Sequence, residues 1–219
     1  MIEVRNLSCE IGGKQIIDDI TLRVDRGDHI VITGSSGAGK SSLLKALMGG
    51  LSGVTGTISL DGIELTNHSV ENYRSRIIYI PQEPQLGAEN VRDALLLPFT
   101  FKRNAGTHPT DRQIEALLAE VGLYPEIQEA SCNSLSGGER QRIAIVRSLL
   151  LNKTIIVADE VTSALDPANK NSVMNLLFKQ NHTILSVSHD KDWIERCSRV
   201  ITMHQGSLTK EHGNEWSST

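Results

Sequence analysis

The chain has 219 residues, of which 39% are hydrophobic and 22% are charged, and its net charge at pH 7 is −4. This is the composition of an ordinary globular protein, and an acidic balance without a dense Lys/Arg block argues against a nucleic-acid binder. No uncharged run approaches the roughly 20 apolar residues of a membrane helix, and no signal-peptide stretch opens the chain, so we expect a soluble, cytoplasmic protein.

The N-terminal part changes from one strand pattern to another and then to a helix. Residues 2–4 and 20–24 place alternate apolar side chains on one face, which is typical of half-buried antiparallel strands. The run Ile30–Ile32 is continuously apolar and predicts a strand buried on both faces. A glycine-rich segment, 34–39, follows, and leucines at helical spacing predict a helix over 40–51. Strand, glycine loop and helix in this order form half of a βαβ unit.

Strands and helices continue to alternate along the rest of the chain. The remaining strands are predicted at 57–60, 77–80, 154–158, 183–187 and 200–203. Three helices are predicted: one after the capping box Thr110–Gln113, one over 136–151 and one opened by Asp166-Pro167. The polar tail from Gly206 is expected to fray.

This order predicts an α/β fold with three parts. We expect a core with a parallel sheet and an antiparallel β subdomain over 1–83 and 152–209, an inserted helical subdomain over 84–151, and a flexible tail over 210–219. Three widely separated cysteines, Cys9, Cys132 and Cys197, lack metal-ligand spacing and are expected to stay reduced.

The segment 34–42 matches the P-loop pattern G-x-x-x-x-G-K-[ST]. Its residues are Gly34, Ser35, Ser36, Gly37, Ala38, Gly39, Lys40, Ser41 and Ser42. Glycines let successive backbone N–H groups turn toward phosphate oxygens, and the following helix adds its positive N-terminal end. The pattern assigns Lys40 to the β- and γ-phosphates and the Ser41 hydroxyl to Mg²⁺. A flexible Gly/Ser loop is the plain alternative, but a position between a buried strand and a helix favours phosphate binding.

Two carboxylates follow the predicted strand 154–158. Because α/β sheets bind ligands at the C-terminal ends of their strands, Asp159 is expected to face the metal. Glu160 is expected to act on the attacking water as general base or to orient it. By itself, such a pair could equally cap a turn; beside a P-loop, the catalytic interpretation is favoured.

The segment Leu135–Arg142, Leu-Ser-Gly-Gly-Glu-Arg-Gln-Arg, resembles the LSGGQ signature of ATP-binding cassette (ABC) ATPases. Ser136, Gly137, Gly138 and Glu139 stand at a predicted helix N-terminus, which can hold a second anion. The resemblance implies a P-loop NTPase core of the RecA-like type and a head-to-tail homodimer. In such a dimer each ATP lies between the P-loop of one subunit and the signature of the other.

Further positions match the same family one by one. The resemblance places Gln82 at the Mg²⁺ and water site, where it senses a membrane partner, and makes His189 the switch histidine that holds the γ-phosphate. It also makes Ser163–Asp166 the D-loop at the dimer interface, with Asp166 as a helix cap as well. It therefore implies ATP and Mg²⁺ as ligands and integral membrane permease subunits as partners, at the inner face of the cell membrane.

Some residues depart from the family pattern. Ile11 stands where an aromatic ring usually stacks on adenine, which puts base affinity and the preference for ATP over GTP in question. Val161 and Ser42 replace the usual Pro and Thr without removing a charge. Several stretches, among them 82–98, are similar to the branch of bacterial iron-export and metal-stress ATPases, although the substrate is set by the membrane partner.

Two other classes of protein fit the sequence less well. A soluble ABC ATPase acting on ribosomes or DNA usually has two cassettes or long coiled-coil insertions, and this chain has one cassette and no heptads. A P-loop kinase or GTPase would need an acceptor site or base-reading motif and would not need the signature.

Overall fold

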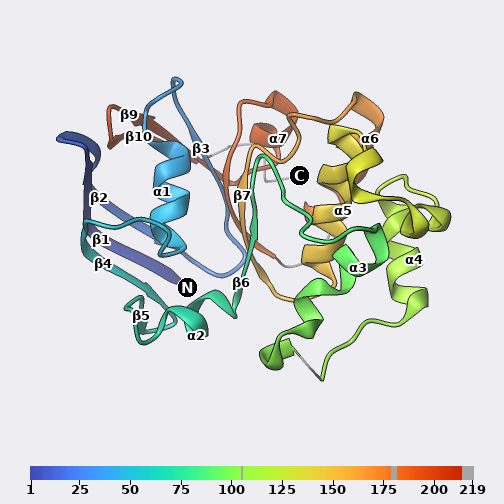
Figure 1. Cartoon of the computed structure of the whole chain (residues 1–219). Helices are drawn as coiled ribbons and strands as arrows, with labels where there is room; N and C mark the ends of the chain where they lie inside the picture. The colour runs from blue at the N-terminus through green and yellow to red at the C-terminus, as the bar shows by residue number, and fades with distance from the viewer. Residues whose placement is uncertain (105, 179–181, 214–219) are drawn as a thin grey trace. The chain divides into compact units, whose positions relative to one another are not determined.

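The computed structural model describes residues 1–104, 106–178 and 182–213 (Figure 1). Their contacts group into two compact units, which are described separately. The first contains residues 1–79, 154–160 and 182–213, and the second contains the intervening residues 80–104, 106–153 and 161–178.

The N-terminal strands of the first unit form an antiparallel sheet, as the alternating pattern predicts. Its strand order is β2-β1-β4-β5, with bounds β1 (Ile2–Ile11), β2 (Lys14–Val24), β4 (Val54–Leu60) and β5 (Ile63–Glu64). Ile2 pairs with Val24 and Val4 with Leu22, and all four side chains are buried. Their shared face packs into the main hydrophobic cluster of this unit, which stabilises the sheet.

A second sheet has six strands in the order β10-β9-β3-β8-β7-β6. Their bounds are β3 (His29–Thr33), β6 (Ile77–Ile80), β7 (Ile155–Asp159), β8 (Thr183–Val187), β9 (Arg199–His204) and β10 (Ser207–Gly213). The neighbouring pairs β9/β3, β3/β8 and β8/β7 are parallel. Residues 30–32 of β3 are buried, which confirms the predicted strand covered on both faces, and every residue of β7 and β8 is buried as well.

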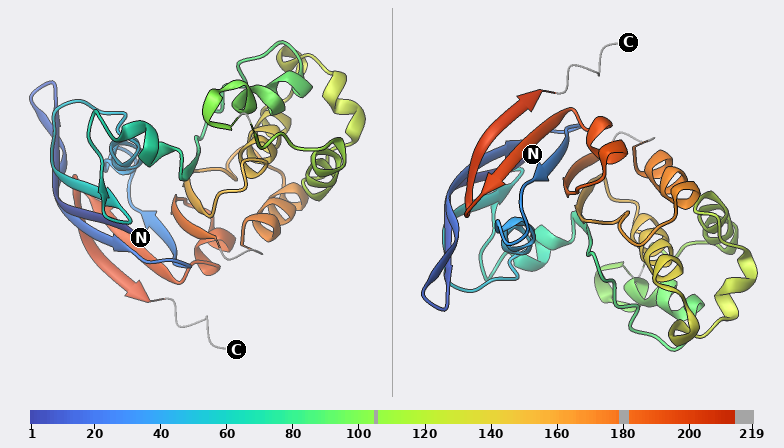
Figure 2. Two further views of the ribbon diagram at one scale, coloured as in Figure 1. Left: turned by 90° about the horizontal axis from the view of Figure 1, so that it is seen from below. Right: turned by 90° about the horizontal axis from the view of Figure 1, so that it is seen from above.

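The expectation that the chain frays from Gly206, with a flexible tail from residue 210, was wrong for the described part. Residues 207–213 form β10, antiparallel to β9, visible in red in Figure 2. An edge strand needs only one hydrogen-bonded neighbour, so polar side chains that face water are compatible with it. Arg199 on β9 adds an ion pair with Glu211, 2.6 Å between Nε and Oε1. Residues 214–219 lie outside the described ranges.

The first unit also contains three helices, α1 (Lys40–Leu47), α2 (Val70–Arg74) and α7 (Lys191–Glu195). Helix α1 starts as predicted but ends at Leu47 rather than at residue 51. The reason is local: Gly49 takes a left-handed conformation (φ 64°), and the N–H groups of Gly49 and Gly50 bond back to Ala46 and Lys45. Glycine is favoured at such a helix end because it has no Cβ.

The second unit consists of helices around α5, which contacts α3 and α4 (Figure 2). Its α-helices are α3 (Val91–Leu96), α4 (Asp111–Glu120), α5 (Gly137–Leu149) and α6 (Pro167–Phe178). Short 3-10 helices span Leu97–Thr100, Lys102–Asn104, Pro125–Glu129 and Cys132–Ser134. The predicted capping box at Thr110 and Gln113 is present at the start of α4.

The boundary between the parts differs from the predicted one. Helix α6 was predicted within the core, but it contacts α4 and so groups with the second unit. The predicted helical segment 84–151 lies entirely within that unit, apart from residue 105. Among the described helices, none has the length and apolar character needed to span a membrane.

Candidate functional site

The predicted catalytic segments of the first unit meet because of strand order. Strands β3, β8 and β7 are parallel neighbours, with Ile32 paired to Val187 and Val187 paired to Asp159. Their C-terminal ends therefore lie at one edge of the sheet. The P-loop follows β3, His189 follows β8, and Glu160 follows β7, so residues far apart in sequence share one site.

Two positions in the loop between β3 and α1 have backbone conformations that only glycine adopts without strain. Gly34 has φ 140° and Gly39 has φ 104°, both in the left-handed half of conformational space. A Cβ at Gly34 would collide with the Met203 carbonyl oxygen, and one at Gly39 with the carbonyl oxygen of Ile16. Ser35, Ser36 and Gly37 are exposed at the crest, whereas Ala38 is buried and its carbonyl accepts from Gly206 N at 3.0 Å.

Lys40 lies under this crest, where the loop folds around its side chain. The residue is only 7% exposed, and its ammonium donates to the carbonyl oxygens of Gly34 (2.8 Å) and Ser35 (2.9 Å). Lys40 is also the first residue of α1, so its positive charge adds to the positive end of the helix dipole. The result is a concentrated positive site for an anion such as a phosphate group.

Ser41 and Asp159 bring two oxygen ligands together beside the loop. The Ser41 hydroxyl donates to Asp159 Oδ1 at 3.2 Å, and Asp159 is 4% exposed. Burial raises the pKa of Asp159 above its usual value; the bond from Ser41 and the charges of Lys45 and Lys40 offset this rise only in part, and the charge of Glu160 adds to it. A desolvated carboxylate next to a hydroxyl is a chemically suitable pair for Mg²⁺, which prefers oxygen ligands. These residues therefore fit the predicted metal.

Glu160 and His189 lie together at the same sheet edge. His189 Nε2 is 3.6 Å from Glu160 Oε1, and the side chains are 53% and 25% exposed, respectively. Glu160 has φ 46°, which is rare for a residue with a Cβ, and its N–H donates to the Val187 carbonyl at 2.9 Å. Such strained residues concentrate at functional sites, and here the turn directs a carboxylate toward the histidine.

The signature segment lies in the second unit, at the start of α5. The Ser136 hydroxyl accepts from Glu139 N at 3.2 Å and donates to Glu139 Oε2 at 2.7 Å, and Ser136 N donates to the same carboxylate oxygen at 2.9 Å. The hydroxyl and backbone bonds from Ser136 lower the pKa of Glu139. The predicted site of unpaired N–H groups is thus partly closed by a capping box, and Gly137 and Gly138 provide the remaining first-turn N–H groups.

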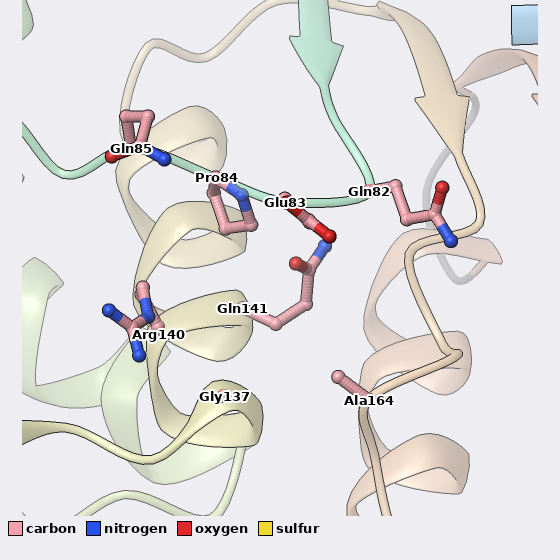
Figure 3. A pocket seen from close by; sticks show the side chains of 8 residues that line it. All are labelled: Gln82, Glu83, Pro84, Gln85, Gly137, Arg140, Gln141 and Ala164. Carbon is pink, nitrogen blue, oxygen red and sulfur yellow. The ribbon is translucent and has the colours of Figure 1, made fainter.

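Gln82 lies in the second unit too, at one end of a hollow of about 290 Å³ (Figure 3). Gln141 reaches from α5 toward Glu83, and its Nε2 donates to the Pro81 carbonyl at 3.4 Å. Arg147, two turns further along α5, donates to the carbonyls of Leu86 (2.7 Å) and Gln85 (3.0 Å). Sequence reasoning missed Gln141 and Arg147 as residues that hold the segment after β6 through hydrogen bonds. The available signal was the charge of Arg147, which lies beside the apolar residues of α5.

The structure also shows the surroundings of two other predicted site residues, Asp166 and Ile11. Asp166 caps α6, because its Oδ1 accepts from the N–H groups of Ala168 and Asn169, both at 3.1 Å. This confirms the predicted cap, while its role at a dimer interface stays a prediction. Ile11 ends β1 beside the glycine turn and is 48% exposed.

The predicted site residues divide between the two units. The P-loop, Asp159, Glu160 and His189 belong to the first unit, and Gln82, Ser136–Glu139 and Asp166 belong to the second.

A glycine-rich loop wrapped around a buried lysine at a helix start, beside a strand-end carboxylate, defines the class of P-loop nucleoside triphosphatases. Comparison with known proteins gives the family. The family model described as "ABC transporter" matches residues 17–163, and the chain belongs to this family. It is an ATP-binding subunit of an ABC transporter and, as an enzyme, an ABC ATPase.

Curated relatives cover nearly the whole chain. The "Probable iron export ATP-binding protein FetA" of Escherichia coli (strain K12) is 32% identical over 214 residues, 95% of this chain and 94% of that protein. The energy-coupling factor transporter ATP-binding protein EcfA2 of Staphylococcus aureus (strain MRSA252) is 34% identical, covering 90% of this chain and 72% of the relative. The methionine import ATP-binding protein MetN of Haemophilus ducreyi is also 34% identical, but this chain spans 64% of its length.

Solved structures of ABC cassettes share the fold. The dimeric cassette MJ0796 in a post-hydrolysis state bound to ADP and Pi has a TM-score of 0.87 and 25% identity, over 98% of this chain and 99% of that one. The ATP-binding subunit of another ABC transporter has a TM-score of 0.86 and 28% identity. These comparisons confirm the predicted family and the predicted fold class.

Proposed function

We propose that this chain binds Mg-ATP at the sheet edge of its first unit and hydrolyses it in a head-to-tail homodimer, in order to drive a membrane permease. The observation that carries the proposal is the buried Lys40 ammonium enclosed by the P-loop, next to the Ser41–Asp159 pair. Lys40 and the loop N–H groups bind the phosphates, and Ser41 and Asp159 hold Mg²⁺. The metal supplies charge neutralisation on the phosphate oxygens.

Glu160 and His189 carry the proposed chemistry. The Glu160 carboxylate receives the proton of the attacking water or orients that water, and His189 holds the γ-phosphate side of the site. Their separation of 3.6 Å supports this division, because one water-sized region can then be reached by both side chains. The exposure of His189 supports contact with a bound ligand rather than a structural role in the core.

The second half of the proposed site is the signature of a partner copy. The capture of a homologous cassette as a dimer bound to ADP and Pi supports this assembly. Gly137 and Gly138 offer first-turn N–H groups, and Ser136 holds the turn in shape through the capping box. Glu139 stands where the family pattern has glutamine, and its charge is satisfied within the same turn.

Ser136→Ala is expected to leave ATP binding to the monomer unchanged and to lower turnover by about tenfold, because the turn that presents the signature N–H groups loses its cap. Loss of an N-cap also costs about 1 kcal/mol of stability. Thr110→Ala is the matched control, since Thr110 has the same capping box on α4 of the same unit. Equal turnover in the two variants would contradict a role of Ser136 at the shared site.

Ile11 is proposed to lie against the base. Replacing it with tyrosine is expected to tighten ATP binding by about two- to tenfold, because an aromatic ring adds roughly 0.5–1.5 kcal/mol of stacking. Titration of ATP and GTP into the wild-type chain and Ile11→Tyr measures both affinity and selectivity. Unchanged affinities for both nucleotides would show that this position does not contact the base.

The proposal extends to the membrane partner and its cargo. The similarity to FetA over nearly the full length of both proteins supports export of iron or another metal. MetN and EcfA2 are about as similar, so the cassette itself discriminates little between directions and substrates. In this proposal the chain is cytoplasmic and is held at the inner face of the cell membrane by its permease.

Affinity purification tests the partner class directly. Tagged Glu160→Gln, which should hold unhydrolysed nucleotide, is purified from detergent-solubilised cells with Mg-ATP, and Lys40→Ala serves as the nucleotide-free control. A multispanning membrane protein in near-equal amount, enriched over the control, is the expected result and would name the permease. Ribosomes or DNA-repair proteins instead would favour a soluble ABC ATPase, the alternative function.

A further inference from the structure

The loop that carries His189 is closed by a side-chain contact at its two ends. Ser186 lies near the end of β8 and Trp193 lies on α7, and both are almost completely buried, 0% and 1% exposed. Trp193 Nε1 donates to Ser186 Oγ at 2.8 Å. His189 lies between them in sequence, and its side chain is about half exposed. The contact therefore closes a short segment that presents the proposed switch histidine at the surface.

Ser186 also connects this loop to the strand that leads into the P-loop. Its hydroxyl donates to the Ile30 carbonyl on β3 at 3.0 Å. The directions of both bonds follow from chemistry, because an indole N–H only donates and a carbonyl oxygen only accepts. One buried hydroxyl thus joins β8, β3 and α7, and a fully satisfied buried network of this kind is rigid.

Hydrogen bonds inside the loop order the residues on both sides of His189. Ser188 Oγ accepts from Asp190 N at 3.1 Å, and Asp190 Oδ1 accepts from Asp192 N at 3.0 Å, which caps α7. On the other side, the Val187 carbonyl accepts from Glu160 N at 2.9 Å. The same short segment therefore sets the backbone positions of both His189 and Glu160.

We infer that Trp193 and Ser186 form a buried clasp that positions His189 against Glu160, so that Trp193 is a positioning residue for ATP hydrolysis. The inference rests on the proposed role of His189. Neither residue belongs to the P-loop, the acidic pair or the signature. The clasp acts through geometry, because a displacement of about 1 Å at a catalytic group can lower a rate by up to about 10²-fold.

Trp193→Phe removes the indole N–H and keeps an apolar ring in its place. We expect turnover at saturating Mg-ATP to fall by roughly three- to tenfold, with the affinity for ATP unchanged, because the P-loop is untouched. Ser186→Ala removes the other partner with little change in volume and should reproduce the effect. An equal loss of affinity and turnover, or wild-type turnover in both variants, would overturn the inference.

Thr183→Val is the matched control for general damage to β8. Thr183 is buried at the opposite end of this strand, and its hydroxyl oxygen accepts from Gly27 N at 3.0 Å. The control should lower the melting temperature to a similar extent and leave turnover at the wild-type value. A turnover loss in Thr183→Val equal to that in Trp193→Phe would reduce the clasp to ordinary core packing and overturn the positioning role.

Two further measurements separate the clasp from the proposed function itself. In a His189→Ala background, Trp193→Phe should cause no additional loss, and a full additional loss would show that the clasp acts elsewhere. The imidazole NMR signal of His189, assigned by its absence in His189→Ala, should broaden or shift in Trp193→Phe and stay unchanged in Thr183→Val. Wild-type turnover in His189→Ala would refute the catalytic role of His189, whereas an unchanged imidazole signal in Trp193→Phe would refute the clasp.

Discussion

Glu160→Gln is expected to lower ATP turnover by about 10²–10⁴-fold, the usual contribution of a general base. Glutamine has nearly the same shape as glutamate but cannot accept the proton of the attacking water. Nucleotide binding should persist, because the Lys40 and Ser41–Asp159 contacts are unchanged. The measurement is phosphate release at saturating Mg-ATP, together with nucleotide affinity and the mass of the complex, which should increase to that of a trapped dimer.

The control for this variant is Glu3→Gln, a carboxylate on β1 of the same unit that pairs with Arg5 at 2.9 Å. It should turn over at the wild-type rate. Near-normal turnover in Glu160→Gln would mean that another group positions the water, and the strained turn at residue 160 would then need a different explanation.

Lys40→Ala is expected to weaken ATP binding by about 10²-fold or more. Each hydrogen bond from a charged donor contributes roughly 1.5–3 kcal/mol, and about 1.4 kcal/mol corresponds to a tenfold change in affinity. The ammonium also bridges the Gly34 and Ser35 carbonyls, so its loss removes the group around which the loop is folded. Isothermal titration with Mg-ATP measures the affinity, and Lys40→Met, which retains most of the side-chain volume, separates loss of charge from loss of packing.

Lys210→Ala is the control, because Lys210 is an exposed lysine on β10 of the same unit. It should bind ATP as the wild type does. Affinity within twofold of the wild type in both Lys40 variants would contradict the P-loop assignment and with it the proposed function as a whole.

Features such as helix caps were predicted well from sequence, because they depend on residues that lie close together in the chain. The predicted capping box at Thr110 depends on residues three apart in the chain, and it is present. The helix after the P-loop was predicted too long, since the leucine spacing continued past two glycines that end α1 after Leu47. The three cysteines, expected to be reduced, are free and buried.

The edge strand β10 shows why a polar composition misleads at a sheet edge. Residues 207–213 have too few apolar side chains to predict a strand, and their order comes from backbone pairing with β9 and from the Arg199–Glu211 ion pair. Neither contact can be deduced from the segment alone, because both depend on which strand lies beside it.

By itself, the sequence determined the P-loop, the acidic pair, the signature and the starts of helices α1, α4, α5 and α6, because each depends on residues within a few positions of one another. Only the tertiary structure decided that Ser41 lies 3.2 Å from Asp159, although 118 positions separate them in the chain. It alone decided that Ser186 joins Ile30 and Trp193. The physical reason is that strand order and register bring these groups together, and periodicity within one segment does not specify which strand becomes its neighbour.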